Sequence, residues 1–301
     1  MTVSTIHYQQ CPCCGSSSIQ HQLIAKDYTV SNLDFSIWHC QNCSCRFTQD
    51  IPIQSEIGAF YQSENYVSHS DTQKGFINKV YHIVRNITLQ SKRKIVQQYT
   101  GKKSGSLLDV GAGTGAFSTE MKNYNWQVTG LEPDETARKV AFEKFKLALQ
   151  SPEQLFQLAA HSYDAITMWH VLEHVHDLHG YLEQFQKITK ADGKLFIAVP
   201  NYTSKDAAHY QSFWAAYDVP RHLYHFSPKS IDVLAQQHGF VVEKHLPMWF
   251  DSVYVSMLSE QYKNGGKGNV IAAILQGFVS NLFSLLNVKK CSSIIYILRK
   301  K

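Results

Sequence analysis

The stretch Leu107–Phe117, LLDVGAGTGAF, decides the fold of this 301-residue chain. A short apolar run, which predicts a buried strand, leads directly into three alternating glycines and then into a helical pattern. Glycines let the backbone turn tightly and let a ligand approach it closely, and the N-terminus of the following helix favours a negative group. The stretch also satisfies G-x-G-x-x-A through Ala116, so it does not by itself exclude a dinucleotide enzyme.

Glu132 follows the glycines by about 20 residues, at the end of the second predicted strand. A carboxylate at this place can accept two hydrogen bonds from ribose hydroxyls. The glycines and Glu132 together indicate an adenosine cofactor without saying which one.

The rest of the chain extends the same α/β pattern. Apolar runs that predict strands alternate with helical segments, and the runs are SLLDV (106–110), QVTGLE (127–132), DAITMW (164–169), KLFIAVP (194–200), GFVVEKHLPM (239–248) and SSIIYILRK (292–300). We therefore expect a doubly wound α/β domain over residues 105–301, with a helical insertion at 250–291 before the last strand.

The uncharged part of this insertion, residues 268–288, is long enough to raise the question of a membrane span. Gln276, Ser280, Ser284 and Asn287 recur at helical spacing and form a polar stripe, so an amphipathic helix without a transmembrane span is favoured. We expect it to dock on its own domain or to form a homodimer contact. A lid over an apolar substrate and a membrane-surface contact are the alternatives.

Six of the seven cysteines lie in the first 45 residues. Cys11 and Cys14 form one C-x2-C pair, and Cys40 and Cys43 form another, which predicts a zinc ribbon over residues 1–50 with one tetrahedral Zn²⁺. Four thiolates leave no open coordination position, so this zinc is expected to be structural. The spare thiols are Cys13 and Cys45, although either one can replace a neighbour as ligand.

Residues 51–104 are expected to form a helical linker or cap, because apolar residues recur three and four positions apart at Phe76, Val80, Ile83, Val84 and Ile87. The net charge of +5 is scattered along the chain and supports a nucleic-acid partner only weakly. The N-terminus has no basic run followed by an apolar core, so we expect a cytoplasmic protein.

Three segments, DVGAGTG (109–115), GLEPDETAR (130–138) and YDAITMWHVLEHV (163–175), resemble in correct order the motifs of class I S-adenosylmethionine-dependent methyltransferases. The resemblance covers roughly residues 106–242 and implies a mostly parallel, seven-stranded, Rossmann-like sheet. It also implies a role in cofactor binding for the glycine loop, for the ribose-binding Glu132, for two residues beside the adenine and for three at the end of the predicted strand 164–169. These residues are Asp109, Gly111, Ala112, Gly113, Gly115, Glu132, Pro133, Asp134, Met168, Trp169 and His170.

The segment His170-Val-Leu-Glu173-His174 also matches the H-x-x-E-H signature of inverted zinc metalloproteases. That function needs both histidines on an established helix, whereas here a predicted strand leads into the segment. We therefore reject the protease hypothesis. Methyltransferases of ubiquinone biosynthesis carry a similar LEHV, and we expect His174 to be a packing or capping residue.

The segment 200–228 follows the predicted strand 194–200, and the loops at this end of an open α/β sheet line the ligand crevice. We expect His222 to be the base that takes a proton from the acceptor, with His225 as a second candidate and Asp218 orienting one of them. Arg221 either holds an acidic substrate group or pairs with Asp218. The predicted apolar wall of the pocket consists of Trp214, Tyr217 and Tyr224.

These features favour methyl transfer to an oxygen or carbon atom of a small or lipid-like metabolite. An RNA methyltransferase is the first alternative, because ribosomal RNA guanine methyltransferases resemble this chain in placing a four-cysteine module ahead of the catalytic domain. Against this alternative, no Asn/Asp-Pro-Pro-Tyr/Phe motif follows the predicted strand 164–169. The second alternative is a non-catalytic, cofactor-binding docking module.

Overall fold

The computed structural model describes residues 3–62 and 76–301, and for residues 76–83 it describes the backbone alone. Helix α1 (Phe76–Thr100) begins directly after the gap. The predicted apolar pattern at Phe76, Val80 and Ile83 therefore lies outside the described side chains. The domain limits at residues 50 and 104 stay predictions.

The central sheet has six strands within these described residues. In spatial order they are β11 (Phe240–Pro247), β12 (Ser293–Lys300), β9 (Thr189–Pro200), β8 (Tyr163–Trp169), β6 (Ser106–Val110) and β7 (Gln127–Leu131). Neighbouring strands from β9 to β7 pair in parallel, and β12 is antiparallel to both of its neighbours. The predicted doubly wound, mostly parallel sheet and all six of its quoted strands are confirmed.

The seventh strand that the family resemblance implied is not confirmed, because the described residues form six strands in this sheet. The segment after α3 (Glu135–Phe145) makes a single parallel bridge to the sheet, between Gln150 and Leu131. Its extended run stops there because Pro152 starts a 3-10 helix at Pro152–Gln157. Proline lacks the N–H that a longer ladder would need.

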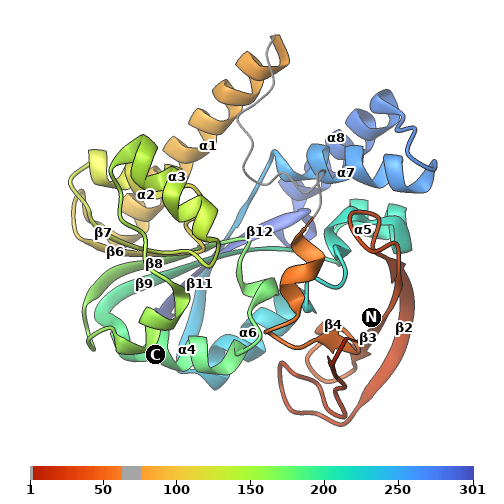
Figure 1. The fold of residues 1–301 in the computed structure, drawn as a ribbon, viewed down its shortest axis with the longest axis horizontal. Helices are drawn as coiled ribbons and strands as arrows, with labels where there is room; N and C mark the ends of the chain where they lie inside the picture. The colour runs from red at the N-terminus through yellow and green to blue at the C-terminus, as the bar shows by residue number, and fades with distance from the viewer. Residues whose placement is uncertain (1–2, 63–75) are drawn as a thin grey trace.

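Helices cover both faces of the sheet, which explains why its strands are apolar without alternation. Figure 1 shows α1, α2 (Ala116–Asn123) and α3 on one face, with α4 (Leu178–Ile188) and α6 (Pro228–Gln237) on the other. On the first side Val96 and Met121 are fully buried, and on the second side Phe185 and Ile188 are. The glycine loop leaves this packed core at the carboxyl end of β6.

The N-terminal region is joined to the α/β region through a shared four-stranded sheet. Its strands are, in spatial order, β10 (Tyr224–His225), β4 (Arg46–Thr48), β3 (Asp34–Cys40) and β2 (Ile19–Lys26). The edge strand β10 comes from the segment after α5 (Lys205–Tyr210), far along the chain, and pairs antiparallel with β4. A smaller pair, β1 (Thr5–Ile6) with β5 (Ile51–Pro52), closes the region.

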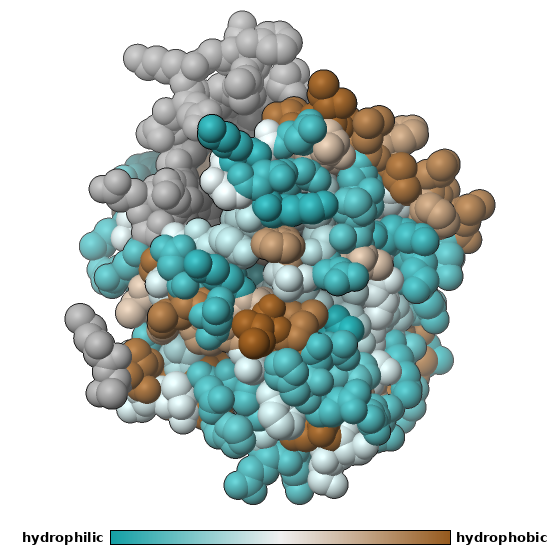
Figure 2. All heavy atoms as spheres, turned by 90° about the vertical axis from the view of Figure 1, so that its right-hand side faces the viewer, coloured by the Kyte–Doolittle hydropathy of each residue, from teal (hydrophilic) through white to brown (hydrophobic). Residues whose placement is uncertain are grey.

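The insertion before the last strand forms a helical hairpin, α7 (Asp251–Lys263) and α8 (Val270–Leu286). The polar stripe of α8 faces inward: Ser280 is fully buried and donates a hydrogen bond of 2.7 Å to Asp206. Its apolar side chains are exposed, namely Val270, Ile271, Ile274, Leu275, Phe278, Val279, Leu282, Phe283, Leu285 and Leu286. Figure 2 shows apolar residues gathered at the upper edge of this face of the molecule. Among the helices that the structure describes, none has the length and apolar character to cross a bilayer.

Candidate cofactor and acceptor sites

The glycine loop between β6 and α2 has a backbone that requires glycine. Gly111, Gly113 and Gly115 have φ values of 70°, 55° and 77°, in the left-handed region. A Cβ atom at Gly111 would lie 2.3 Å from Cγ2 of Val171, and one at Gly115 would lie 2.9 Å from Cδ2 of Leu147. The loop is therefore packed directly against the segment that follows β8.

Two carboxylates brace this loop. Asp109 is 1% exposed and accepts hydrogen bonds from Ser118 Oγ at 2.7 Å and Thr167 Oγ1 at 2.9 Å. Burial raises the pKa of Asp109 to about 6, although both hydroxyl hydrogen bonds act in the opposite direction. Glu132 accepts a hydrogen bond of 2.7 Å from the backbone N–H of Gly113. Its carboxylate thus holds the middle of the glycine loop.

The next two predicted adenine neighbours lie at the rim. Pro133 and Asp134 are exposed, and the carboxylate of Asp134 caps α3 by accepting a hydrogen bond of 2.8 Å from Thr136 N–H. The second oxygen of Glu132 accepts from the Asp134 N–H at 3.0 Å. Asp134 therefore caps α3, and this role is compatible with its predicted position beside the adenine.

The three predicted residues after β8 have different environments. Met168 is fully buried among core residues, so its side chain does not face the crevice. The ring of Trp169 lies edge-on to Phe117 at 5.4 Å, with Lys92 Nζ 4.6 Å from its centroid. His170 has a positive φ of 59° and its Nε2 lies 2.9 Å from Asp251 Oδ2.

His170 ties the β8 loop to the helical insertion. Burial lowers the pKa of its imidazole, but Asp251 and Glu173 outweigh burial and raise that pKa to about 10. Because His170 is then a cation held by two carboxylates, we assign it to a structural ion pair between the loop and α7.

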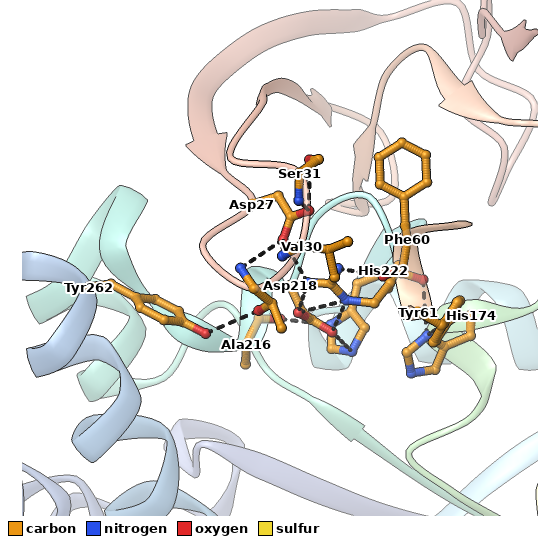
Figure 3. A network of polar contacts seen from close by, with 12 residues as sticks. Asp27, Val30, Ser31, Phe60, Tyr61, His174, Ala216, Asp218, His222 and Tyr262 are labelled. Atoms are coloured by element: carbon orange, nitrogen blue, oxygen red, sulfur yellow. Dashed lines mark hydrogen bonds and ion pairs between the residues drawn. The ribbon is translucent and has the colours of Figure 1, made fainter. Parts of the chain in front are cut away.

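Arg221 pairs with the predicted orienting residue Asp218, which is the second of the two roles foreseen for this arginine. The guanidinium is 1% exposed and contacts both oxygens of Asp218, with Nε 3.1 Å from each. It also donates to Asp27 at 3.0 Å and to the carbonyl oxygen of Phe60 at 2.8 Å. Figure 3 shows this buried network between the N-terminal region and the segment 211–223.

His225 is enclosed in the sheet that the two regions share. It is 3% exposed, its Nε2 lies 3.1 Å from Thr48 Oγ1, and burial lowers its pKa well below the usual range. The predicted wall residues are enclosed as well. Trp214 donates to Asp206 at 2.8 Å, and the Tyr217 hydroxyl accepts a hydrogen bond of 2.6 Å from Arg46. Tyr224 is 2% exposed.

His222 has two neighbours that sequence reasoning did not join to it. One ligand-type atom from each of Glu173, His174 and His222 lies within 4.8 Å of the other two. The two imidazole rings are 4.6 Å apart at their centroids. Glu173 is 0% exposed, and neither of its carboxylate oxygens has a hydrogen-bond partner among the described residues. We call these three residues the Glu–His–His cluster.

The four predicted zinc ligands do come together. The Sγ atoms of Cys11 and Cys43 are 3.6 Å apart, as are those of Cys14 and Cys40, and all four lie within 4.8 Å. Four sulfurs at about 2.3 Å from a tetrahedral centre would be about 3.8 Å apart, so the group fits one such ion. The spare thiols turn away, Cys13 toward the carbonyl of Ser230 and Cys45 toward that of Arg46. We call the four ligands the cysteine cluster.

Comparison with known proteins settles the family. A family model described as a methyltransferase domain matches residues 84–245, which is more than half of the chain. The chain belongs to the methyltransferase domain family. The predicted kinship with S-adenosylmethionine-dependent methyltransferases is thereby confirmed.

Individual relatives agree with this assignment. The chain is 33% identical over 118 residues to the ubiquinone biosynthesis O-methyltransferase of Erwinia tasmaniensis, an alignment covering 37% of this chain and 49% of the relative. It is 31% identical to the protein of the same description from Vibrio cholerae, with 37% and 48% covered. The chain thus spans about half the length of the curated relatives it matches. A solved S-adenosylmethionine-dependent methyltransferase from Archaeoglobus fulgidus shares the fold, with a TM-score of 0.50 at 19% identity, covering 72% of this chain and 94% of that one.

Proposed function

We propose that this protein transfers the methyl group of S-adenosylmethionine to an oxygen or carbon atom of a small or lipid-like metabolite. The observation that carries the proposal is the glycine loop, closed by Glu132 at the carboxyl ends of parallel strands within a methyltransferase domain. The relatives described as O-methyltransferases of ubiquinone biosynthesis support a lipid-like acceptor.

The cofactor residues in this proposal are those of the glycine loop with Asp109 and Glu132, and the rim residues Pro133 and Asp134. Bound S-adenosylmethionine would supply a sulfonium methyl that is already activated for displacement. The chain then has to hold the donor, align the acceptor and take up its proton. Trp169 and the backbone of Met168 and His170 complete the proposed site at the end of β8.

For the acceptor we keep His222 as the first catalytic residue. Its Nδ1 lies 2.8 Å from the carbonyl oxygen of Ala216, so the proton on that nitrogen is engaged and Nε2 is left to act as an acceptor. Asp218 is 3.9 Å from Nε2 but is bound to Arg221, and His225 is enclosed beside Thr48. Their catalytic roles stay predictions with less support.

The remaining parts of the proposal concern metal, partners and location. The spacing of the cysteine cluster supports a structural Zn²⁺ in a ribbon over residues 1–50. The exposed apolar face of α8 supports a homodimer through residues 268–288, which light scattering of the wild type and of Phe278→Glu would test. Reduced thiols that bind metal are typical of the cytoplasm, which is the proposed location.

Transfer from radiolabelled S-adenosylmethionine into a cell extract, fractionated into lipid, small-molecule, protein and RNA pools, tests the proposal. We expect label in the lipid or small-molecule pool. Label in RNA alone would contradict the acceptor class and favour the RNA hypothesis. Absence of label together with normal cofactor binding would favour the docking module.

The same assay tests His222. We expect His222→Ala to lower turnover at least about a hundredfold, the usual contribution of a positioned base. His176→Ala is the matched control, because its imidazole lies in the same loop region and is hydrogen-bonded to a backbone carbonyl, Pro52 O at 3.0 Å. Equal rates in the two variants would remove His222 from the mechanism.

A further inference from the structure

The Glu–His–His cluster contains a buried carboxylate whose hydrogen-bonding capacity is unmet. Glu173 is 0% exposed, and both oxygens lack a hydrogen-bond partner within the described chain. The nearest cation is His170, whose Nδ1 lies 3.4 Å from Oε1 and which is shared with Asp251. A buried charge left without hydrogen bonds is costly, so such a group is expected to have a partner of another kind.

Both histidines of the cluster are oriented as metal ligands usually are. His174 Nδ1 lies 2.9 Å from the carbonyl oxygen of Arg221, and His222 Nδ1 lies 2.8 Å from that of Ala216. An Nδ1–H that donates to a backbone carbonyl fixes the tautomer and leaves the lone pair on Nε2. The Tyr61 hydroxyl also lies 3.0 Å from His174 Nδ1 and further holds this ring (Figure 3).

We propose that Glu173, His174 and His222 bind a divalent transition-metal cation, separate from the one held by the cysteine cluster. Ligand atoms about 2.1 Å from one ion lie about 3 to 4 Å apart, so small side-chain rotations from the present spacing suffice. Two imidazole nitrogens and one carboxylate oxygen favour Zn²⁺, Fe²⁺, Ni²⁺ or Mn²⁺ over Ca²⁺. Three protein ligands leave coordination positions for another molecule.

The position of the cluster suggests what the bound cation would do in methyl transfer. The segment that carries Glu173 and His174 packs against the glycine loop, because Val171 lies against Gly111. We infer from this that the cation would lie near the proposed methyl donor. This step rests on the proposed function. A cation here would lower the pKa of an acceptor hydroxyl, which assigns the acceptor to hydroxylated metabolites. In this arrangement Nε2 of His222 binds the cation instead of acting as the base, so the hydroxyl proton passes to water. The hydroxyl oxygen then forms the bond to the methyl carbon, and the carbon–sulfur bond breaks to release the thioether.

Mn²⁺ is a suitable probe, because thiolates favour softer ions and its free form is measured directly by electron paramagnetic resonance. The full chain, with the cysteine cluster loaded with zinc, is titrated with Mn²⁺. We expect one saturable site, weakened at least tenfold by Glu173→Gln and by His222→Ala. His176→Ala should bind as the wild type does. Circular dichroism of each variant checks that the fold is kept, and the near-isosteric Glu173→Gln keeps the test valid if His222→Ala unfolds.

Metal content gives a second readout. Protein purified without chelators should hold two ions per chain, and Glu173→Gln should hold one. A wild type with one ion and no saturable Mn²⁺ binding would overturn the inference, as would wild-type binding by Glu173→Gln. If His222→Ala abolishes methyl transfer while no metal binds, the proposed function stands and the cation does not. If Mn²⁺ binds as expected and no acceptor is methylated, the site stands and the proposed function fails.

Discussion

The cysteine cluster and the Glu–His–His cluster each bring ligand atoms within 4.8 Å, yet they differ in how their charge is balanced. In the first, the N–H groups of Cys13 and Cys45 donate to the Sγ atoms of Cys11 and Cys43 at 3.4 Å each. In the second, the Glu173 carboxylate receives no hydrogen bond from the described residues. A closed set of four thiolates is suited to holding a fold together, whereas an open set of three ligands, whose carboxylate accepts no hydrogen bond from the described residues, is suited to binding another molecule.

Removing the first cluster should have the largest effect. The double variant Cys14→Ser/Cys40→Ser is expected to lose the ion of the cysteine cluster and to unfold the N-terminal strands, since structural zinc contributes about 10 kcal/mol or more in small domains. Metal content and limited proteolysis measure this. Cys13→Ala is the control and should keep the metal, because its Sγ points to Ser230. A double variant that retains stoichiometric metal would show that other ligands are used.

Arg221 connects the two regions, and its substitution should have the second largest effect. Arg221→Met leaves Asp27 and Asp218 without their shared cation in a buried setting, so we expect a loss of about 3 to 5 kcal/mol in unfolding free energy. Urea unfolding measures the loss. The cysteine cluster should keep its metal, whereas Mn²⁺ binding should weaken because the Arg221 carbonyl orients His174. A loss below about 1 kcal/mol would mean that the network contributes little.

A substitution at Gly113 should weaken cofactor binding without affecting either metal cluster. Gly113→Val should raise the Kd for S-adenosylmethionine at least about a hundredfold, because φ of 55° strains any side chain and the loop is held by Glu132. Calorimetry measures the Kd, and metal content should not change. Gly265→Ala is the matched control: its φ is +61°, but a Cβ there meets nothing within 4 Å. Equal affinities in the two variants would refute the loop assignment.

In contrast to Glu173, Asp164 is a buried carboxylate with several ionic and hydrogen-bond partners. Its substitution should have the smallest effect of the four. It contacts Lys102, accepts from Lys190 Nζ at 2.8 Å and accepts from Ser106 N–H at 2.8 Å. Burial raises the pKa of Asp164, but these partners outweigh burial and hold it below the usual range.

The stabilisation from Asp164 is therefore full above the unfolded-state pKa near 4 and is lost as the pH falls through the lower folded-state pKa. We expect Asp164→Asn to cost about 2 kcal/mol at pH 7 and less at pH 3, measured by urea unfolding at both values. A cost that does not change with pH would contradict the role of its charge.

The same contrast explains what the sequence can predict. The cysteine cluster follows from two C-x2-C pairs, and the glycine loop and six strands follow from local patterns. The Glu–His–His cluster does not, because His222 is distant from Glu173 in the sequence and follows directly after Arg221, whose buried ion pairs with Asp27 and Asp218 hold that segment. The ion pair of His170 with Asp251 could not be predicted from the sequence either, because Asp251 lies far along the chain, in the insertion. The family resemblance implied a seventh strand that is not confirmed, and the segment after α3 turns instead into the 3-10 helix that starts at Pro152.

The strand β10 also has a consequence for synthesis on the ribosome. Its residue Tyr224 pairs with Phe47 of β4, so the fourth strand of the N-terminal sheet is made long after the other three. At 5 to 20 residues per second, the intervening roughly 180 residues take about 10 to 35 seconds to emerge. During that interval β4 is an exposed edge that can pair with other chains. Early metal capture by the four cysteines would keep the nascent segment ordered while it waits for its last strand.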